Sequence, residues 1–400
     1  MEYLFSNRIG ALAPSAIREI LKATSQPGII PFAAGNPAPE AFPVQAVREI
    51  CARVLQERPV DCLQYGITEG YAPLRARVRE DIQNRLQIGA DFDDLIITSG
   101  AQQVADLATK ALCNEGDVVI AESPSFIGAL NTFRSYGARL RGVPLQHDGM
   151  DVDALEDILR TEKNVRFIYT IPNYQNPSGV TMSEDKRRRV YELARQYGVL
   201  ILEDNPYGEL KYDPPQRISD LPGTPEGEAL PCIKSFDTDG IVIYAGSFSK
   251  ILSPGLRVGY ALAPAPLIAK MTVGKQASDV HTPIFNQIIV DEWMKNYDVG
   301  AHVKEICKIY TAKRDVMCDG LAGTVLRFQR PAGGLFLWCE LPEGINMLDY
   351  ARRAVEKKVA VVPGVAFAVE PGDPINAVRL NFSTPTNEQL KQGVEILRSL

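Results

Sequence analysis

The chain of 400 residues is 45% hydrophobic and 23% charged, which suffices to fill a sizeable core in about two or three domains. Its formal net charge of -6 argues against a nucleic-acid surface, and no apolar run approaches the roughly 20 residues of a membrane span. The start lacks a signal sequence, and the seven cysteines form no CxxC pair. We therefore expect a cytoplasmic enzyme without a metal and without nucleic-acid or membrane partners.

Residues 46–290 predict a large α/β domain, because short β-branched runs alternate there with helical patterns. Such alternation is typical of a mostly parallel sheet between two layers of helices. The expected strands are Leu95 to Thr98, Val118 to Ala121, Arg166 to Thr170, Val199 to Glu203, Ile241 to Ala245 and Val258 to Leu262. Helices are expected from Ala101 to Leu112 and from Glu184 to Tyr197, the second capped by Ser183 and ended by Gly198.

The two ends of the chain predict a smaller α+β domain. Residues 1–45 include a Pro- and Gly-rich stretch typical of an irregular arm. From about residue 291 to 400, longer amphipathic helices precede two apolar runs, Gly333 to Trp338 and Ala377 to Phe382. We expect the arm and this C-terminal segment to fold together.

Polar and aromatic residues follow consecutive predicted strands, where ligands bind in open α/β sheets. Ser99 and Gly100 open a helix whose free N–H groups would hold a phosphate, although a Ser-Gly turn is also ordinary packing. Phe126 follows the second strand and either stacks on a heterocycle or belongs to the core. Asn176 lies in the loop 172–179, whose amides either meet a ligand or cap local backbone.

Asp204 follows the most apolar strand, where a carboxylate is costly unless it is paired. A protonated ring nitrogen would pair with it, while a helix-capping role is the alternative. Ser247, Ser249, Lys250 and Arg257 place hydroxyls, an amine and a guanidinium in one segment, which suggests a lysine that forms a Schiff base with pyridoxal phosphate (PLP). To react, Lys250 needs burial or a neighbouring cation such as Arg257 to lower its pKa.

In this order the motifs resemble the fold type I PLP-dependent aminotransferases of class I/II, above all the branch with 2-aminoadipate and kynurenine aminotransferases. The resemblance covers essentially the whole chain. The segments that carry it are 33–40, 64–66, 69–75, the strand-end motifs, 247–259 and 378–382.

The resemblance implies a role for each matching residue. Lys250 would bind the cofactor covalently and carry the proton, Asp204 would pair with the ring nitrogen, and Tyr207 with Asn176 would contact the phenolic oxygen. Phe126 would stack on the ring. The phosphate would be held by Ser99, Gly100, Ala101, Gln102, Ser247, Ser249 and Arg257. Tyr65 would reach the phosphate of a neighbouring subunit, which makes a homodimer with shared active sites the expected assembly.

The resemblance also implies where substrate binds. Arg379 would bind the α-carboxylate, with Gly35, Asn36 and Asn176 nearby; a surface salt bridge is the alternative for Arg379. Arg18 would meet a side-chain carboxylate, or else be a solvated helix arginine.

The expected activity is a ping-pong transfer of an amino group from an L-amino acid to a 2-oxo acid. Donors would be 2-aminoadipate, glutamate, and aromatic or aliphatic amino acids. Two other functions stay open at this point: a PLP-dependent lyase or decarboxylase on the same scaffold, and a non-catalytic effector module. Related effector modules are fused to a winged-helix domain, and the early start of the arm favours the free enzyme.

Overall fold

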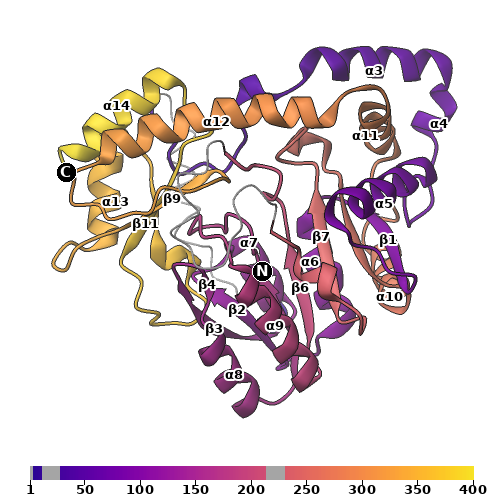
Figure 1. Ribbon diagram of the computed structural model, residues 1–400, viewed down its shortest axis with the longest axis horizontal. Helices are drawn as coiled ribbons and strands as arrows, with labels where there is room; N and C mark the ends of the chain where they lie inside the picture. The colour runs from indigo at the N-terminus through magenta and orange to yellow at the C-terminus, as the bar shows by residue number, and fades with distance from the viewer. Residues whose placement is uncertain (1–2, 11–27, 213–229) are drawn as a thin grey trace.

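The computed structural model describes residues 3–10, 28–212 and 230–400, and its largest element is an eight-stranded sheet (Figure 1). The strand order is β1-β8-β7-β6-β5-β2-β3-β4. The strands are β1 (Asp93–Thr98), β2 (Val118–Ser123), β3 (Arg139–Gln146), β4 (Gly149–Met150), β5 (Val165–Thr170), β6 (Leu200–Asp204), β7 (Val242–Ser247) and β8 (Gly259–Pro264).

The sheet is mostly parallel, which brings the strand ends together. β2, β3, β5, β6 and β7 pair in parallel, whereas β8 runs antiparallel between β7 and β1. The start of β8 therefore lies at the same edge as the ends of β1, β5, β6 and β7. This edge collects the residues that precede Gly259 and those that follow Thr98 and Thr170.

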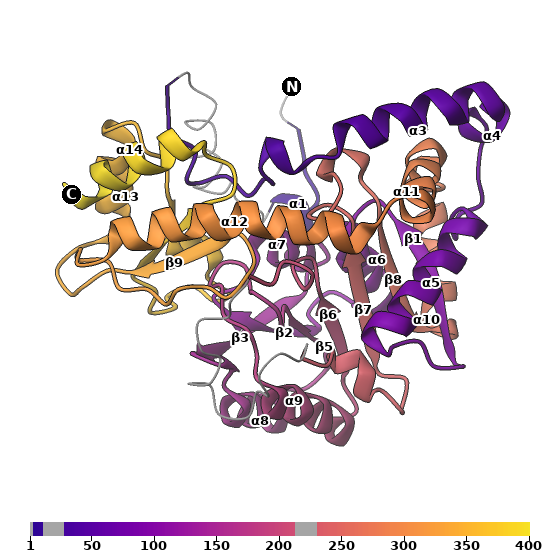
Figure 2. The ribbon, with the colours of Figure 1, turned by 45° about the horizontal axis from the view of Figure 1, so that its top comes forward.

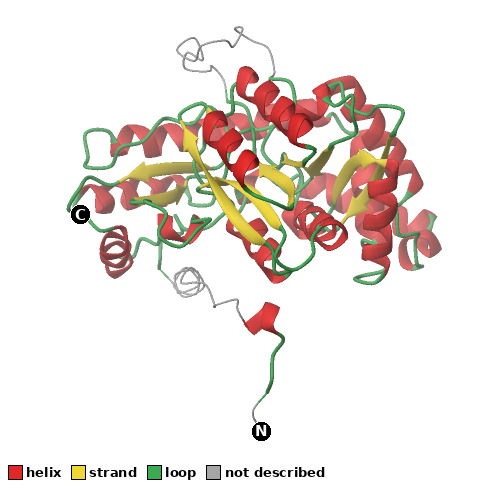
Figure 3. Ribbon diagram, turned by 90° about the horizontal axis from the view of Figure 1, so that it is seen from below, coloured by secondary structure: helices red, strands yellow, loops and turns green. Residues whose placement is uncertain are grey.

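Helices cover both faces of the sheet, as the strand residues show. Val119, Phe167 and Leu202 belong to one hydrophobic cluster, while their neighbours Ile168 and Ile201 belong to a second. The first cluster includes side chains of α6 (Ala101–Leu112), α7 (Ile127–Ser135) and α10 (Ala265–Gln276); the second includes those of α8 (Val152–Thr161) and α9 (Glu184–Tyr197). Figures 2 and 3 show the resulting three layers, with strands between helices.

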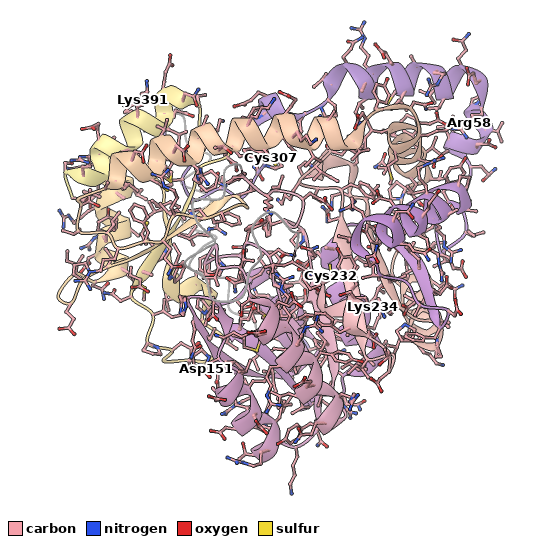
Figure 4. The ribbon with its side chains drawn as sticks, viewed as in Figure 1. Arg58, Asp151, Cys232, Lys234, Cys307 and Lys391 are labelled. Carbon is pink, nitrogen blue, oxygen red and sulfur yellow. The ribbon has the colours of Figure 1, made fainter. Side chains whose placement is uncertain are left out.

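Further helices lie at the β1 side of the sheet and across the molecule. α3 (Val44–Glu57), α4 (Pro59–Leu63) and α5 (Ala72–Leu86) pack against α11 (Ile284–Asn296). Arg58 lies at the turn between α3 and α4 (Figure 4). The long helix α12 (Val299–Leu321) runs from this region to the smaller sheet (Figure 1).

The smaller sheet joins the two ends of the chain. Its antiparallel strands follow the order β10 (Val362–Pro363), β11 (Ala377–Asn381), β9 (Phe336–Glu340), beside α13 (Met347–Glu356) and α14 (Asn387–Arg398). The early segment adds to it, since Ile30 forms a bridge with Val359 and the Asn381 amide donates to the Phe32 carbonyl at 2.8 Å. The exposed helix α1 (Asn7–Gly10) lies near the N-terminus, where it contacts α7 and is not part of the smaller sheet (Figure 3).

The predicted fold class is confirmed: an α/β three-layer part with a mostly parallel sheet and a smaller α+β part. α9 spans the predicted Glu184–Tyr197, and Gly198 ends it with a φ of 68°. Ser183 occupies the predicted N-cap position of α9, but its hydroxyl donates to Asp148 Oδ2 at 3.3 Å instead of accepting from an amide of the helix. β3 was missed, and the domain boundaries after residues 45 and 290 stay predictions. Within the ranges given above, no helix has the length and apolar composition for crossing a membrane.

Candidate active site

The predicted site residues meet at the edge where β1, β5, β6 and β7 end and β8 begins. Ser99 follows β1, Asn176 lies in the loop after β5, and Asp204 ends β6. Ser247 ends β7, and Arg257 precedes β8. The antiparallel direction of β8 brings Arg257 to this edge, although it stands before a strand and the others stand at or after strand ends.

Lys250 has the environment of a reactive amine. Its Nζ donates to the carbonyl oxygen of Gly35 at 3.0 Å, which joins the early segment to the β7 end of the sheet. Burial lowers the pKa of Lys250, and the nearby Arg379 and Arg257 lower it further, to about 8. About a tenth of the amine is therefore neutral at pH 7, and a nucleophile or proton carrier requires this neutral form.

Asp204 is a buried carboxylate with one oxygen left over. The Tyr169 hydroxyl donates to Oδ2 at 2.9 Å, while Oδ1 has no hydrogen-bond partner in the described part of the chain. Burial raises the pKa of Asp204, and the Tyr169 hydrogen bond opposes this, which leaves it at about 6. The site can therefore accept a cationic donor at Oδ1.

The guanidinium of Arg379 is buried, and both of its terminal nitrogens donate hydrogen bonds to the protein. Nη1 donates to Asn176 Oδ1 at 3.0 Å, and Nη2 donates to the carbonyls of Ala33 at 2.9 Å and Ala34 at 3.2 Å. Nε has no partner among the residues described. Burial lowers the pKa of Arg379 to about 10, so it stays charged at neutral pH.

Two phenyl rings lie close to this guanidinium. Its central carbon lies 4.3 Å from the ring centre of Phe336 and 5.0 Å from that of Phe367. Such cation–π contacts fix the plane of the fork without using its N–H groups. Sequence reasoning missed both rings, which come from β9 and from the turn after β10.

Asn176 connects Arg379 to Tyr207. Its Nδ2 lies 3.5 Å from the Tyr207 hydroxyl, while its Oδ1 accepts from Arg379. Burial raises the pKa of Tyr207, so its hydroxyl keeps its proton. Asn176 and Tyr207 therefore offer neutral donors beside Arg379.

Gly100 and Arg257 lie at the start of α6. Gly100 precedes the helix with a φ of 79°, and among the described residues no side-chain hydrogen bond caps this helix start. Arg257 Nη2 donates to the Ser99 carbonyl at 2.9 Å, and a Cβ on Gly100 would overlap this guanidinium. Ser247 Oγ donates to Ser249 Oγ at 2.9 Å.

Two further predicted cofactor residues, Gln102 and Phe126, have their side chains near Gly128. Gln102 Nε2 donates to the Gly128 carbonyl at 3.0 Å and to Thr132 Oγ1 at 2.6 Å, so only its backbone N–H faces the helix start. Phe126 is partly buried, and a Cβ on Gly128 would meet its ring and the Gln102 amide.

Three further predicted residues are Tyr65, Asn36 and Arg18. Tyr65 is 82% exposed, with its ring edge-on to His281 at 5.7 Å between centres. The Asn36 carbonyl accepts from Ser383 and Thr384. Arg18 falls outside the described residues.

Glu122 is a buried group near the site that sequence reasoning missed. It ends the core of β2 and accepts from Thr170 Oγ1 at 2.6 Å, from the Ile171 amide at 3.1 Å and from Gln175 Nε2 at 3.2 Å. Burial raises its pKa to about 7. It thereby anchors the loop that carries Asn176. An acidic residue at the end of an apolar strand, the signal used for Asp204, would have found it.

Comparison with known proteins identifies the family. The family model for aminotransferase class I and II matches residues 27–397. The aromatic-amino-acid aminotransferase 1 of Thermococcus litoralis is 39% identical and covers 99% of this chain and 93% of its own length. The 2-aminoadipate transaminase of Thermus thermophilus is 40% identical, with 98% and 95% covered.

A solved structure agrees with these matches. The kynurenine aminotransferase of Pyrococcus horikoshii, in complex with PMP, has a TM-score of 0.92 at 36% identity and covers 99% of this chain and 96% of its own. With the sheet-edge geometry above, the matches along the whole length show that the chain belongs to the class I and II aminotransferases and is a PLP-dependent transaminase.

Proposed function

We propose that this transaminase has a broad site that takes 2-aminoadipate, glutamate, and aromatic or aliphatic L-amino acids as donors. The observation that supports amino-group transfer is the convergence of a partly neutral Lys250 and a half-partnered buried Asp204 with the fork of Arg379, which reaches Asn176 from β11. Relatives named for aromatic amino acids, 2-aminoadipate and kynurenine support the breadth.

The residues at this edge fit PLP. When bound, PLP supplies an aldehyde that condenses with amines and a cationic ring that withdraws electrons from the substrate α-carbon. The partnerless Oδ1 of Asp204 suits the ring nitrogen, and the uncapped start of α6 with Gly100, Ala101, Gln102 and Arg257 suits the phosphate. Ser247 and Ser249 would contribute hydroxyls there. Phe126 would cover one ring face.

Each catalytic side chain then has a distinct task. Lys250 accepts the proton from the substrate α-carbon and returns it to the acceptor carbon, since its lowered pKa allows both directions near neutral pH. With the cofactor bound, Asp204 would stay anionic beside the ring nitrogen. Tyr207 and Asn176 would donate hydrogen bonds to the phenolic oxygen.

Arg379 and the early segment would hold the substrate. The free Nε edge of the Arg379 fork suits a carboxylate, and the contacts with the rings of Phe336 and Phe367 help to fix its plane. Gly35 and Asn36 would line the same place. Arg18 would meet an acidic side chain and move aside for an apolar one.

We further propose a cytoplasmic homodimer with shared sites. Tyr65 extends from the surface, and neighbouring apolar residues are exposed too: Val60, Leu63 and Ile67. A cluster of this kind on a soluble protein marks an interaction surface, and a second copy would cover it. The domain boundaries proposed are 1–45, 46–290 and 291–400.

Borohydride reduction of the holoenzyme and peptide mapping test the central assignment. The cofactor is expected on Lys250, and Lys250→Ala is expected to lose turnover by at least about 1,000-fold, the usual scale for such a group. Lys391→Ala is the matched control, because Lys391 is exposed on α14, far from the site (Figure 4). A label on another side chain, or a Lys250→Ala enzyme with near-normal turnover, would contradict the assignment.

The donor range is tested by absorbance titration of the holoenzyme with one amino acid at a time. Acidic, aromatic and aliphatic donors should each bleach the cofactor band. A response confined to one class would rule out the broad site. In Arg18→Ala, the acidic donors should react more weakly while the aromatic ones keep their rate; unchanged glutamate and 2-aminoadipate reactivity would remove the role of Arg18.

A further inference from the structure

All three polar atoms of Ser99 form hydrogen bonds with other residues of the protein. Its amide N–H donates to Gln103 Oε1 at 2.7 Å, and its hydroxyl donates to Asp279 Oδ2 at 2.9 Å. Its carbonyl accepts from Arg257 Nη2 at 2.9 Å. Ser99 thus connects Arg257 to the start of α6 and to the segment after α10.

The amide and hydroxyl hydrogens of Ser99 are both donated to other groups of the protein, so neither is available to a phosphate. An ionised carboxylate has no hydrogen of its own, so the Ser99 hydroxyl hydrogen must point to Asp279. Burial raises the pKa of Asp279, but hydrogen bonds from Gln103 and Lys275 outweigh it and keep the pKa below its ordinary value. Thr282 Oγ1, 3.3 Å from the Ser99 hydroxyl oxygen, then donates to a lone pair. Toward a phosphate, Ser99 would present only electron pairs.

Behind Ser99 lies a closed set of three side chains. Lys275, whose side chain is fully buried, donates to Gln103 Oε1 at 2.6 Å and to both Asp279 oxygens at 3.0 Å. Gln103 Nε2 donates to Asp279 Oδ2 at 2.8 Å. Each amide and charge in the set is satisfied, so the set is rigid and carries no net charge. It fixes α10 against the first turn of α6.

We propose that Ser99 does not bind the cofactor phosphate but is the tether through which Lys275, Asp279 and Gln103 hold Arg257 and the start of α6 in phosphate-binding position. This inference rests on the proposed phosphate roles of Arg257 and α6, and it revises the role expected for Ser99. Ser99, Gln103, Lys275 and Asp279 are positioning residues. Neutralisation of Asp279 by Lys275 also keeps an uncompensated negative charge away from the phosphate.

The test compares PLP with pyridoxal, which lacks the phosphate, in binding to resolved enzyme. Ser99→Ala and Asp279→Asn should each raise the Kd for PLP about tenfold, the lower end of the effect of lost supporting hydrogen bonds at ligand sites. The Kd for pyridoxal should not change. The double variant should match the worse single variant, because both changes cut one tether. Asp157→Asn, an exposed change on α8, is the control for loss of an aspartate.

Several outcomes would overturn the proposal. If Ser99 bound the phosphate directly, the effects of Ser99→Ala and Asp279→Asn would add. If the network were only structural, both variants would lower the unfolding temperature of the cofactor-free protein and raise both Kd values alike. Should Asp279→Asn not fold, Gln103→Met with Ser99→Ala forms the same cycle. Unchanged PLP affinity in Arg257→Gln would instead reject the proposed phosphate site itself.

Discussion

The buried carboxylate of Asp204 lowers the stability of the cofactor-free protein at neutral pH. It is buried, its Oδ1 has no partner within the residues described, and its pKa is raised to about 6 from an ordinary value of 3.8. Between these two values the folded protein binds more protons than the unfolded chain. Stability therefore falls as pH rises from about 4 to 6 and stays reduced above that range.

Asp204→Asn should remove this cost. At pH 8 the cofactor-free variant is expected to be more stable than the parent by about 3 kcal/mol, and the gain should shrink below pH 5, where the parent carboxyl takes up its proton. Turnover should fall by about 100-fold or more, since a neutral amide cannot keep the ring nitrogen protonated. Urea unfolding at pH 4.5 and 8 and steady-state assays provide the measurements. A variant that is less stable than the parent at pH 8 would refute this account of Asp204.

The location of a site residue was predictable where that residue comes directly after a predicted strand or in the loop that follows it. Asp204 and Asn176 follow strands, so a linear pattern located both at the same edge. The rings around Arg379 were not predictable, because Phe336 and Phe367 come from β9 and the turn after β10 and meet the guanidinium only in the folded chain. A local sequence pattern does not show which distant segments pack together.

At the scale of elements, the start of α6 depends on one backbone conformation. Gly100 has φ 79° and ψ 169°, a region that is nearly confined to glycine. Gly259 approaches it so closely that a Cβ there would lie 2.8 Å from the Gly100 carbonyl carbon. The helix start, the β8 start and the Arg257 guanidinium thus share one tight space.

Gly100→Ala should damage this space. Backbone strain should destabilise the protein by about 1–3 kcal/mol, and displacement of Arg257 should weaken PLP binding at least about tenfold. Gly116→Ala is the matched control: Gly116 also has a positive φ, of 86°, but its Cβ would meet open space. Denaturant unfolding and PLP titration separate the two effects. Equal PLP affinities in the two variants would show that the overlap with Arg257 does not matter.

Elements were predicted best where apolar periodicity and end signals agreed. α9 combines an amphipathic pattern with Gly198 as its stop, and its bounds matched. β3 has a mixed burial pattern and two arginines, Arg139 and Arg141, so no alternation marked it in the sequence. Ser183 shows the limit of cap signals, since a nearby acceptor, Asp148, competed for its hydroxyl.

On the scale of the whole molecule, fold class followed from the alternation of strands and helices, but the joining of distant segments did not. The bridge between Ile30 and Val359 and the network of Lys275 and Asp279 depend on tertiary packing. The surface of α4 and the loop after it poses a related question of assembly. Val60 is 70% exposed, Leu63 76% and Tyr65 82%, a costly arrangement for apolar groups unless a partner covers them.

Mixing two inactive variants tests whether Tyr65 acts across a dimer interface. Lys250→Ala and Tyr65→Ala homodimers each have two defective sites, but a heterodimer contains one site with both native residues if Tyr65 serves the neighbouring subunit. Random reassociation after mild denaturation makes half of the dimers hybrid, so activity should rise to about a quarter of the parent value. Activity assays of mixed and unmixed samples, with light scattering for mass, provide the measurement.

The interface itself can be broken as a control on this result. Val60→Glu with Leu63→Glu should give monomers that cannot complement, whereas Leu348→Glu should leave the dimer intact, because Leu348 is a half-exposed apolar residue on α13 at the opposite end of the molecule. Mixing that yields only the average of the two unmixed activities would mean that Tyr65 acts within its own subunit. A parent protein that scatters light as a monomer would reject the shared site altogether, since Tyr65 would then have no second phosphate to reach.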